Sequence, residues 1–430
     1  MTGEHNFRRA PHILFLTALF ISIAGFLGYY DGVNFITPPS AVVLGAQLIL
    51  ITAAISVLRM RMFEGTARLA PLFALAIWAA LTILWTDDAL ISTRRWLLIF
   101  VPSIGLALLA ATDSRPERSF TWIKWLLIAI TLGSCIFSLI IYAFGETYGI
   151  QGNRHKFERF RVLDLGGWVV GVSEGGRQYL NLNLYIHRFS GFTTNPNSFA
   201  LFAALALISL CATARTKIKS GGWIEITLIL ITAVILAMSA SRAAVAMAFA
   251  GLFIIFLLRF GQRNLARLCV TAILALTVLL YLLIVFQAGL GGGGEEEIFD
   301  PRQRADVWRL AIHAAADVWF QGLGFGMTQE ALFTPLGIQT SAHSVPLSML
   351  LETGIVGLLL SLIVWFLPVF TLTRTNTQLS NTSIAIVALL VALFVHQTVD
   401  SSVFRYHWAH FVFAYLIGAS SQLAARHHNA

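Results

Sequence analysis

The chain has 430 residues, of which 57% are hydrophobic and only 12% are charged. A soluble protein carries about a quarter of its residues as charged side chains. The apolar residues also lie in long blocks, which excludes a soluble fold and requires a membrane. The formal net charge of +8 is typical of basic loops in a membrane protein, and we expect no nucleic-acid partner. Cys135, Cys211 and Cys269 lie singly in apolar blocks, which predicts neither disulfides nor a zinc site.

Apolar blocks of roughly 17–25 residues are long enough to cross the hydrocarbon region as helices. The sequence contains about twelve of them, which predicts an all-α integral membrane protein with about twelve transmembrane helices. The blocks lie at 13–30, 40–58, 69–85, 96–112, 120–144, 197–214, 223–239, 242–259, 267–286, 346–371, 383–400 and 407–424. They divide the chain into helices over 1–144, a loop over 145–196, helices over 197–286, a second loop over 287–345, and helices over 346–430.

The distribution of basic residues predicts the orientation of these helices. If the N-terminus is cytoplasmic, the inner segments contain Arg8, Arg9, Arg59, Arg61, Arg68, Arg115, Arg118, Arg215, Lys217, Lys219, Arg259, Arg263, Arg267, Arg374 and Arg426. The short outer segments then contain only Arg94, Arg95, Arg242 and Arg405. This asymmetry follows the positive-inside rule. It predicts that both termini are cytoplasmic and that the two long loops are extracytoplasmic.

The first long loop has the composition of β-strands. Residues Tyr179 to His187 alternate apolar and polar side chains with a period of two. Phe160 to Val172 is also rich in β-forming residues, and Ser173 to Arg177 between the two segments is typical of a turn. The pattern predicts a short β-hairpin on the outer face.

The second long loop is expected to contain an amphipathic helix. It opens with the flexible, solvated run from Gly291 to Glu297. Asp300, Pro301 and Gln303 then have the spacing of a capping box, with Asp as the N-cap and Pro at the first helical position. The predicted helix extends to about Phe320. Its polar face contains Arg302, Asp306, Arg309, His313 and Asp317, and its apolar face contains Trp308, Ile312, Ala315 and Trp319.

Arg304 is out of place in this pattern. It lies four residues before Trp308 and therefore belongs to the apolar face. A guanidinium on such a face is costly without an anionic partner. One interpretation is a snorkelling side chain or a pair with a nearby acid. The other is an anion site, because arginine binds phosphate through two parallel hydrogen bonds.

Two further polar residues lie at predicted membrane boundaries. Arg242 follows Ser241 at the outer end of an apolar block, where a lone arginine is more often an interfacial side chain. His343 directly precedes a predicted span for which Ser344 is the expected cap and Pro346 fits the first turn. A helix N-terminus disfavours a charged imidazole, so a neutral His343 could accept a proton. A lone histidine at such a boundary is more often structural than catalytic.

The order of these motifs resembles the O-antigen ligase and polymerase superfamily. The resemblance covers roughly residues 185–360, and its most specific part runs from Arg304 to Gly357. The motifs are Arg188-Phe189-Ser190-Gly191-Phe192 with Asn195-Pro196-Asn197, Ser241-Arg242, Arg304 with Trp308, Gly322 to Gly326, His343-Ser344, and Leu350 to Gly357. The glycines at 322–326 lack the spacing of a nucleotide-binding fingerprint.

The resemblance implies a glycosyltransferase in the bacterial inner membrane with an active site that faces the periplasm. Members move a glycan from a polyprenyl (undecaprenyl) diphosphate to an acceptor hydroxyl on a lipid or another glycan. The family's essential arginines match Arg242 and Arg304, and its essential histidine matches His343. His343 is then the expected base, and the arginines are expected to stabilise the diphosphate leaving group. Arg188 and Asn197 are weaker candidates for donor contact; capping of a helix is the alternative role for Asn197.

No acidic cluster with metal-ligand spacing occurs in the outer segments, so we expect a metal-independent, inverting transfer without a cofactor. Membrane lipids and other polysaccharide-assembly proteins are expected partners. The acceptor is left open, because a polymerase that joins lipid-linked repeat units would use the same residues, and the outer hairpin is longer than a minimal ligase needs. A glycolipid flippase or a transporter is the alternative from another class. Such proteins place ionisable groups near the midplane, whereas Glu352 and Asp400 are the main ones here and lie near span ends.

Overall fold

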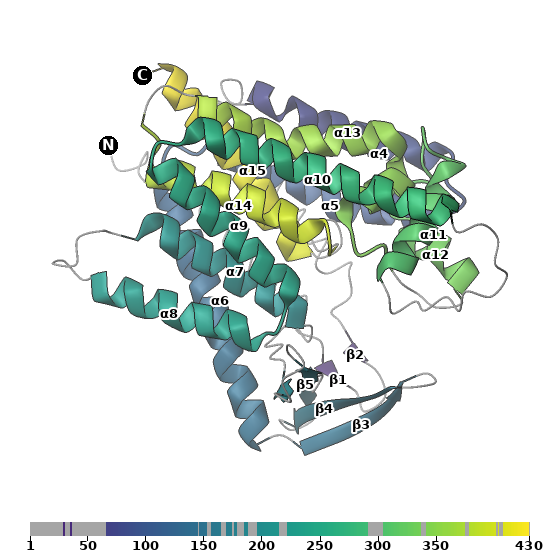
Figure 1. Cartoon of the computed structure of the whole chain (residues 1–430), viewed down its shortest axis with the longest axis horizontal. Coiled ribbons are helices and arrows are strands. Elements are labelled where there is room, and N and C mark those ends of the chain that lie inside the picture. Colours follow the sequence, from purple (N-terminus) through teal and green to yellow (C-terminus); the bar gives the residue numbers. More distant parts are fainter. Residues whose placement is uncertain are drawn as a thin grey trace, which may run out of the picture.

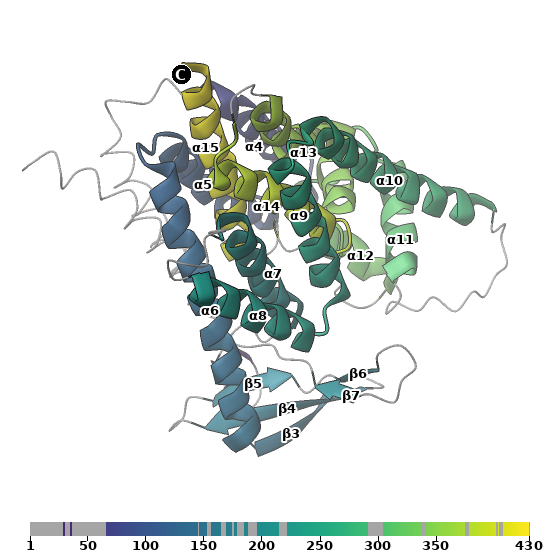
Figure 2. The ribbon, with the colours of Figure 1, turned by 60° about the vertical axis from the view of Figure 1, so that its left-hand side comes forward.

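A computed structural model describes residues 66–144, 196–214, 222–290, 304–336, 341–374, 378–400, 403 and 407–429, and short strands between residues 29 and 187. In this part of the chain, helices form one bundle and the strands lie at the C-terminal end of α6 (Pro116–Phe144) (Figure 1). In the turned view the strands lie beside the last turns of α6 and below the other helices (Figure 2).

The helices follow the apolar blocks of the sequence. Their bounds are η1 (Thr66–Leu69), α4 (Ala70–Leu81), η2 (Thr82–Leu84), α5 (Ala89–Ala111), α6 (Pro116–Phe144), α7 (Pro196–Thr213), α8 (Gly222–Met238), α9 (Arg242–Arg259), α10 (Arg263–Leu290), α11 (Arg304–Ala316), α12 (Thr328–Leu336), α13 (Val345–Arg374), α14 (Asn381–Gln397) and α15 (His407–Asn429). The predicted spans from 69–85 onward overlap α4 to α10 and α13 to α15. The spans predicted at 13–30 and 40–58 lie outside the described residues, except that Tyr29 and Tyr30 form a strand.

Several helices are long and apolar enough to cross a membrane. Within the described residues these are Ala67–Leu84, Ala89–Ala111, Pro116–Ile140, Arg242–Arg259 and Val345–Arg374; Asn197–Thr213, Gly222–Met238 and Asn381–Gln397 are shorter apolar helices. This confirms an α-helical integral membrane protein. The number of twelve spans and the division into segments stay predictions.

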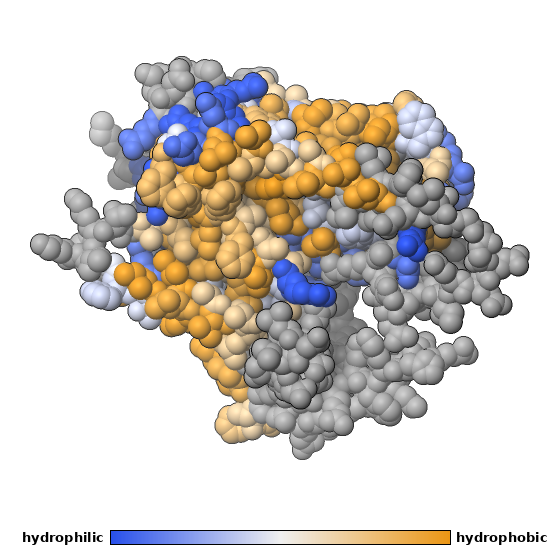
Figure 3. All heavy atoms as spheres, viewed as in Figure 1, coloured by the Kyte–Doolittle hydropathy of each residue, from blue (hydrophilic) through white to orange (hydrophobic). Residues whose placement is uncertain are grey.

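The outer surface of the bundle is apolar. Large side chains such as Ile77, Leu230, Phe249 and Leu359 are exposed on it, and Figure 3 shows hydrophobic residues across most of the described helical surface in that view. An apolar surface of this extent is unfavourable in water and is stable against lipid. Hydrophilic side chains gather instead beside the C-terminus (Figure 3).

The centre of the bundle is formed around α14, which is buried along nearly its whole length. It packs against α9, α7 and α13. The indole N–H of Trp365, in α13, donates to the Leu390 carbonyl oxygen of α14 at 2.8 Å. The centroid of the Trp365 ring lies 4.3 Å from that of the Phe413 ring in α15. The tryptophan therefore joins three helices through a satisfied polar atom and two apolar faces.

The strands form two antiparallel sheets. Five of them, β1 (Tyr29–Tyr30), β2 (Phe35–Ile36), β3 (Glu146–Gly152), β4 (Lys156–Asp164) and β5 (Val169–Ser173), have the order β2-β1-β5-β4-β3, and β6 (Gly176–Gln178) pairs with β7 (Tyr185–His187). The predicted hairpin is therefore wrong in its pairing. Instead of turning back at 173–177, the chain leaves one sheet after Ser173, which pairs with Phe160, and enters the other at Gly176. Alternation marks a strand but does not select its partner.

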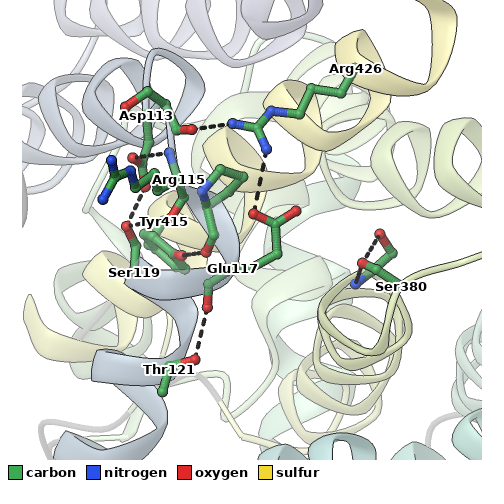
Figure 4. A network of polar contacts seen from close by, with 11 residues as sticks. Asp113, Arg115, Glu117, Ser119, Thr121, Ser380, Tyr415 and Arg426 are labelled. Atoms are coloured by element: carbon green, nitrogen blue, oxygen red, sulfur yellow. Dashed lines mark hydrogen bonds and ion pairs between the residues drawn. The ribbon is translucent and has the colours of Figure 1, made fainter. Parts of the chain in front are cut away.

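One end of the bundle is rich in basic residues. Near Asp113 and Glu117, Arg426 of α15 donates to the Glu117 carboxylate at 3.4 Å and to the Ser114 carbonyl, and the Tyr415 hydroxyl donates to the Pro116 carbonyl at 3.4 Å (Figure 4). These contacts bring the end of α5, the start of α6 and the end of α15 together. We call this the basic end.

The direction of the remaining helices follows from contacts at the same end. Lys124 of α6 donates to Thr213 at the end of α7 at 3.1 Å, and Arg259 at the end of α9 donates to the Cys211 carbonyl at 2.9 Å. Helices α5, α7, α9 and α15 therefore all end at the basic end. They begin at the opposite end, which we call the site end.

Helix α13 is interrupted at Gly354, where φ is 66° and ψ is −169°. The span predicted at 346–371 therefore corresponds to α13, which is long and apolar enough to cross a membrane but has a break that the sequence analysis did not predict. The interruption frees backbone groups of residues 351–355, and the segment after α11 satisfies them: the N–H groups of Leu323 and Gly324 donate to the carbonyls of Leu351 and Glu352, each at 2.9 Å. A broken helix is stable in a membrane only when its freed groups are paired in this way.

Candidate active site

His343 lies immediately before α13 in an uncommon backbone conformation. Its φ is 48°, in the left-handed region that few residues other than glycine adopt. The Ser344 hydroxyl accepts a hydrogen bond from the Leu347 N–H at 3.4 Å, which confirms the predicted cap. Ser344 and Val345 are buried, whereas His343 is partly exposed. The strained backbone and the cap fix the imidazole beside the N-terminus of α13. This N-terminus lies at the site end, because residues 322–326 contact both α13 and Thr86, just before α5.

Helix α11 packs against this segment through one face. Val307, Trp308 and Ala311 are buried in a cluster with Leu332, Ala342 and Leu347. The Trp308 indole N–H donates to the Ala342 carbonyl oxygen at 2.7 Å. Because Ala342 precedes His343 directly, this hydrogen bond holds α11 against the histidine's own backbone.

The predicted faces of α11 are correct only in part. Val307, Trp308, Ala311 and Ala315 form its buried face, and His313 is exposed. The expected extension to Phe320 is wrong, because α11 ends at Ala316 and Trp319 is 60% exposed. The Trp319 carbonyl accepts from the Ile355 N–H at 2.8 Å. The segment after α11 therefore pairs with the backbone at the break in α13 and does not continue the helix.

Arg304 is the first residue of α11. It lies three and four residues before Val307 and Trp308, so its position on the helix is on the buried face. The expected N-cap at Asp300 lies outside the described residues. Arg304 and His343 thus belong to one packed unit, joined through the hydrogen bond from Trp308 to Ala342.

Arg242 is the first residue of α9 and is exposed. It is preceded by Ala240, whose φ of 55° also lies in the left-handed region. The Ser241 side chain makes no capping hydrogen bond. The direction of α9 places Arg242 at the site end, but α9 packs mainly against α14 and α7, whereas α11 packs against α13. Arg242 is therefore on a different helix group from Arg304 and His343.

The weaker candidates are also at helix starts or beyond the described part. Asn197 is the second residue of α7, which begins at the site end, and it is partly exposed. Arg188 lies outside the described residues. Among the residues that the structure describes, no group of three or more His, Cys, Asp or Glu side chains is arranged to hold a metal ion.

The glycines of 322–326 have a structural role that the sequence did not indicate. Gly322, Gly324 and Gly326 all have positive φ. A Cβ at Gly322 would overlap the Glu352 backbone, and one at Gly324 would overlap Thr86. Glycine is required here because the segment approaches the break in α13 and the end of η2 too closely for a side chain.

Two charged residues next to this segment were not among the predicted site residues. Glu352 of α13 accepts from the Thr328 hydroxyl at 2.6 Å, and Arg95 of α5 forms an ion pair with Glu330 at 3.0 Å. Glu352 could have been singled out because an acidic residue in an apolar span requires a partner. For Arg95, no sequence motif indicates a role in the site; the sequence shows only that it lies in a predicted outer segment.

Comparison with known proteins bears on the same region. A family model described as O-antigen ligase matches residues 227–362. The matched segment contains Arg242, Arg304 and His343, and it excludes Arg95, Arg188 and Asn197. No curated protein matches the chain. The match over residues 227–362 supports membership of this chain in the O-antigen ligase and polymerase superfamily, as the order of its motifs predicted.

Proposed function

We propose that the protein transfers a glycan from a polyprenyl diphosphate to an acceptor hydroxyl, as an O-antigen ligase-type glycosyltransferase at the periplasmic face of the bacterial inner membrane. The observation that carries the proposal is the 2.7 Å hydrogen bond from Trp308 to Ala342. It lies within the matched region and joins the helix that begins at Arg304 to the residue before His343. A cation for the diphosphate and a base for the hydroxyl are the groups that such a transfer requires.

The chemistry is a single displacement. His343 takes the proton of the acceptor hydroxyl as its oxygen attacks the anomeric carbon of the donor sugar. The bond from that carbon to the diphosphate oxygen breaks, and its electron pair stays on the diphosphate. The products are the new glycoside and the free polyprenyl diphosphate, and His343 passes its proton to solvent. Attack opposite the leaving group inverts the anomeric configuration.

The arginines act on the leaving group. The negative charge on the diphosphate grows as the glycosidic bond breaks, and Arg304 stabilises it by charge-assisted hydrogen bonds. Arg242 acts on the same group from the start of α9, where the backbone N–H groups and the helix dipole also favour an anion. Asn197 and Arg188 complete the donor contact from the start of α7 and the preceding segment.

A polymerase that joins lipid-linked repeat units is the second candidate. The structural feature that favours it is the sheet at the far end of α6, which runs from the basic end toward the site end (Figure 1). This sheet is large for the recognition of one small acceptor, and we infer that it contacts the acceptor glycan. Other polysaccharide-assembly proteins are candidate partners for the same surface.

The product distinguishes the candidates. The purified full chain, given an undecaprenyl diphosphate-linked oligosaccharide and a lipid A-core acceptor, should release undecaprenyl diphosphate and form one glycosylated acceptor. A ladder of glycans that forms with the lipid-linked donor alone would favour the polymerase. A donor that crosses the membrane with its glycosidic bond intact would refute transfer and support a flippase.

His343 provides the test of mechanism. Activity of the wild type should rise with pH through one ionisation, because only the neutral imidazole accepts a proton. His343→Ala and His343→Gln should both lose transfer while donor binding persists through the arginines. If His343→Gln retains activity with the same pH profile, the residue is not the base.

Metal dependence tests the role of the arginines. If Arg242 and Arg304 stabilise the leaving group, transfer should continue in excess chelator and without nucleotide, because the lipid diphosphate is already an activated donor. Loss of activity on chelation that a divalent metal restores would contradict this account.

A further inference from the structure

Arg95, in the second turn of α5, contacts the first turn of α12 through a planar fork. Its Nη1 and Nη2 atoms lie 3.0 and 3.1 Å from the two Glu330 carboxylate oxygens, and Nη2 also donates to the Gln329 side chain at 2.9 Å. Two parallel hydrogen bonds fix direction as well as distance, which a lysine cannot reproduce. The Arg95 and Glu330 side chains are 29% and 34% exposed, so solvent screens the pair and its importance is geometric.

The start of α12 is held from another helix as well. The Thr328 hydroxyl and N–H donate to the Glu352 carboxylate of α13 at 2.6 and 3.3 Å. Glu352 is buried, and Arg95 lies within electrostatic reach of it. The first turn of α12 is therefore hydrogen-bonded to α5 through Arg95 and to α13 through Glu352. A Cβ at Gly326, just before that turn, would overlap the Arg95 side chain, so the aliphatic part of Arg95 is packed against the backbone there.

Helix α12 in turn supports the candidate site. Leu332 is fully buried and packs in the cluster that contains Val307, Trp308 and Ala342. Trp308 is the residue that ties α11 to Ala342. A shift of α12 would therefore remove part of the wall against which Trp308 is held.

We propose that Arg95 is a positioning residue for glycan transfer: by holding α12 through Glu330, it maintains the Trp308 contact that sets the Arg304 helix against His343. Both terminal nitrogens of Arg95 are occupied by Glu330 and Gln329, so it acts through α12 and not on the substrate. The inference rests on the proposed function. It extends the site to α5, outside the matched residues 227–362.

The experiment compares Arg95→Ala, Arg95→Lys and Glu330→Gln in the purified full chain. Transfer is measured with an undecaprenyl diphosphate-linked oligosaccharide, and hydrogen exchange is followed in the α11 peptides. Displacement of catalytic groups by about 1 Å costs about 100-fold in rate, so we expect kcat of Arg95→Ala to fall by about that factor. The KM for the donor should change far less. Exchange in α11 should rise, and Arg95→Lys, which keeps the charge but loses the fork, should be intermediate in both measurements.

Controls separate this role from a general loss of folding. The adjacent Arg94 is exposed, and Arg94→Ala should match the wild type. Glu330→Gln keeps the shape of a half-exposed side chain and should reproduce the direction of Arg95→Ala without unfolding the chain. Because both residues act through one contact, the double variant should lose no more activity than the worse single variant.

The proposal is overturned if Arg95→Ala retains full activity, if its activity falls without increased exchange in α11, or if the double variant shows additive losses. A wild type that does not transfer glycan from the lipid diphosphate would overturn the proposed function. In that case the exchange measurement would still decide whether Arg95 holds α11 in place.

Discussion

The indole nitrogen of Trp308 lies 2.7 Å from the carbonyl oxygen of Ala342, which is the residue directly before His343. The bond is buried and joins α11 directly to the residue before His343. Together with the buried cluster of Val307, Trp308, Ala311 and Leu347, it sets the position of α11 relative to His343, and it can be removed by one substitution.

Trp308→Phe should therefore reduce transfer without unfolding the protein. Phenylalanine keeps most of the apolar contact but leaves the Ala342 carbonyl unpaired, which costs about 1–3 kcal/mol in a buried site. We expect about a tenfold loss of kcat/KM in a transfer assay. Trp319→Phe is the matched control, because Trp319 is 60% exposed, and it should behave like the wild type. Equal effects of the two substitutions would contradict the role of the hydrogen bond.

Arg304→Lys should lose most activity although it keeps the charge. A lysine cannot form the two parallel hydrogen bonds by which arginine grips a phosphate, so we expect a loss of about 100-fold, on the order seen when one transition-state donor is removed. Arg309, on the same helix, pairs with Asp306 at 3.7 Å and is partly exposed. Arg309→Lys should be nearly silent. Equal tolerance at both positions would show that the buried face of α11 has no special role.

Gly354→Ala should destabilise the protein more than a positive φ alone explains. An alanine there would be strained by about 1–3 kcal/mol in the left-handed region, and its Cβ would also overlap the Phe320 carbonyl. Gly261 has a similar φ of 71° but no neighbour within 4 Å, so Gly261→Ala tests a positive φ without the steric overlap. The melting temperature in detergent should fall clearly further for Gly354→Ala. Equal shifts of the two melting temperatures would contradict the prediction, because they would mean that the contact of Gly354 with the segment from 319 to 324 adds nothing to the cost of the substitution.

The orientation of the helices can be tested by labelling. In a background without Cys135, Cys211 and Cys269, single cysteines at positions 304 and 343 should react in intact cells with a membrane-impermeant maleimide. A cysteine at position 217 should not react until the cells are opened. The reason is the excess of basic residues in the inner segments. Labelling of position 217 alone would reverse the orientation and remove the site from the periplasmic face.

Much of the architecture follows from local sequence. Apolar blocks predict helices because every backbone group in lipid must be paired within its own segment. Ser344 caps α13 as its neighbours imply, and the periodicity of α11 correctly places Trp308 and Ala315 on its buried face. The order of motifs between Arg188 and Gly357 was sufficient to indicate the superfamily.

Only the tertiary structure decided which segments meet. Arg95 and Glu330 are 235 residues apart in the chain, and no periodicity links them. The break at Gly354 and the segment 319–324 depend on each other, because their backbone groups pair across the gap between them. The alternation of apolar and polar residues in a strand likewise does not show that β5 pairs with β4. Local patterns specify faces and ends, because these depend on residues within a few turns. Contacts between distant segments depend on how all the helices of the bundle pack together. The whole sequence determines this packing, but no local pattern in the sequence reveals it.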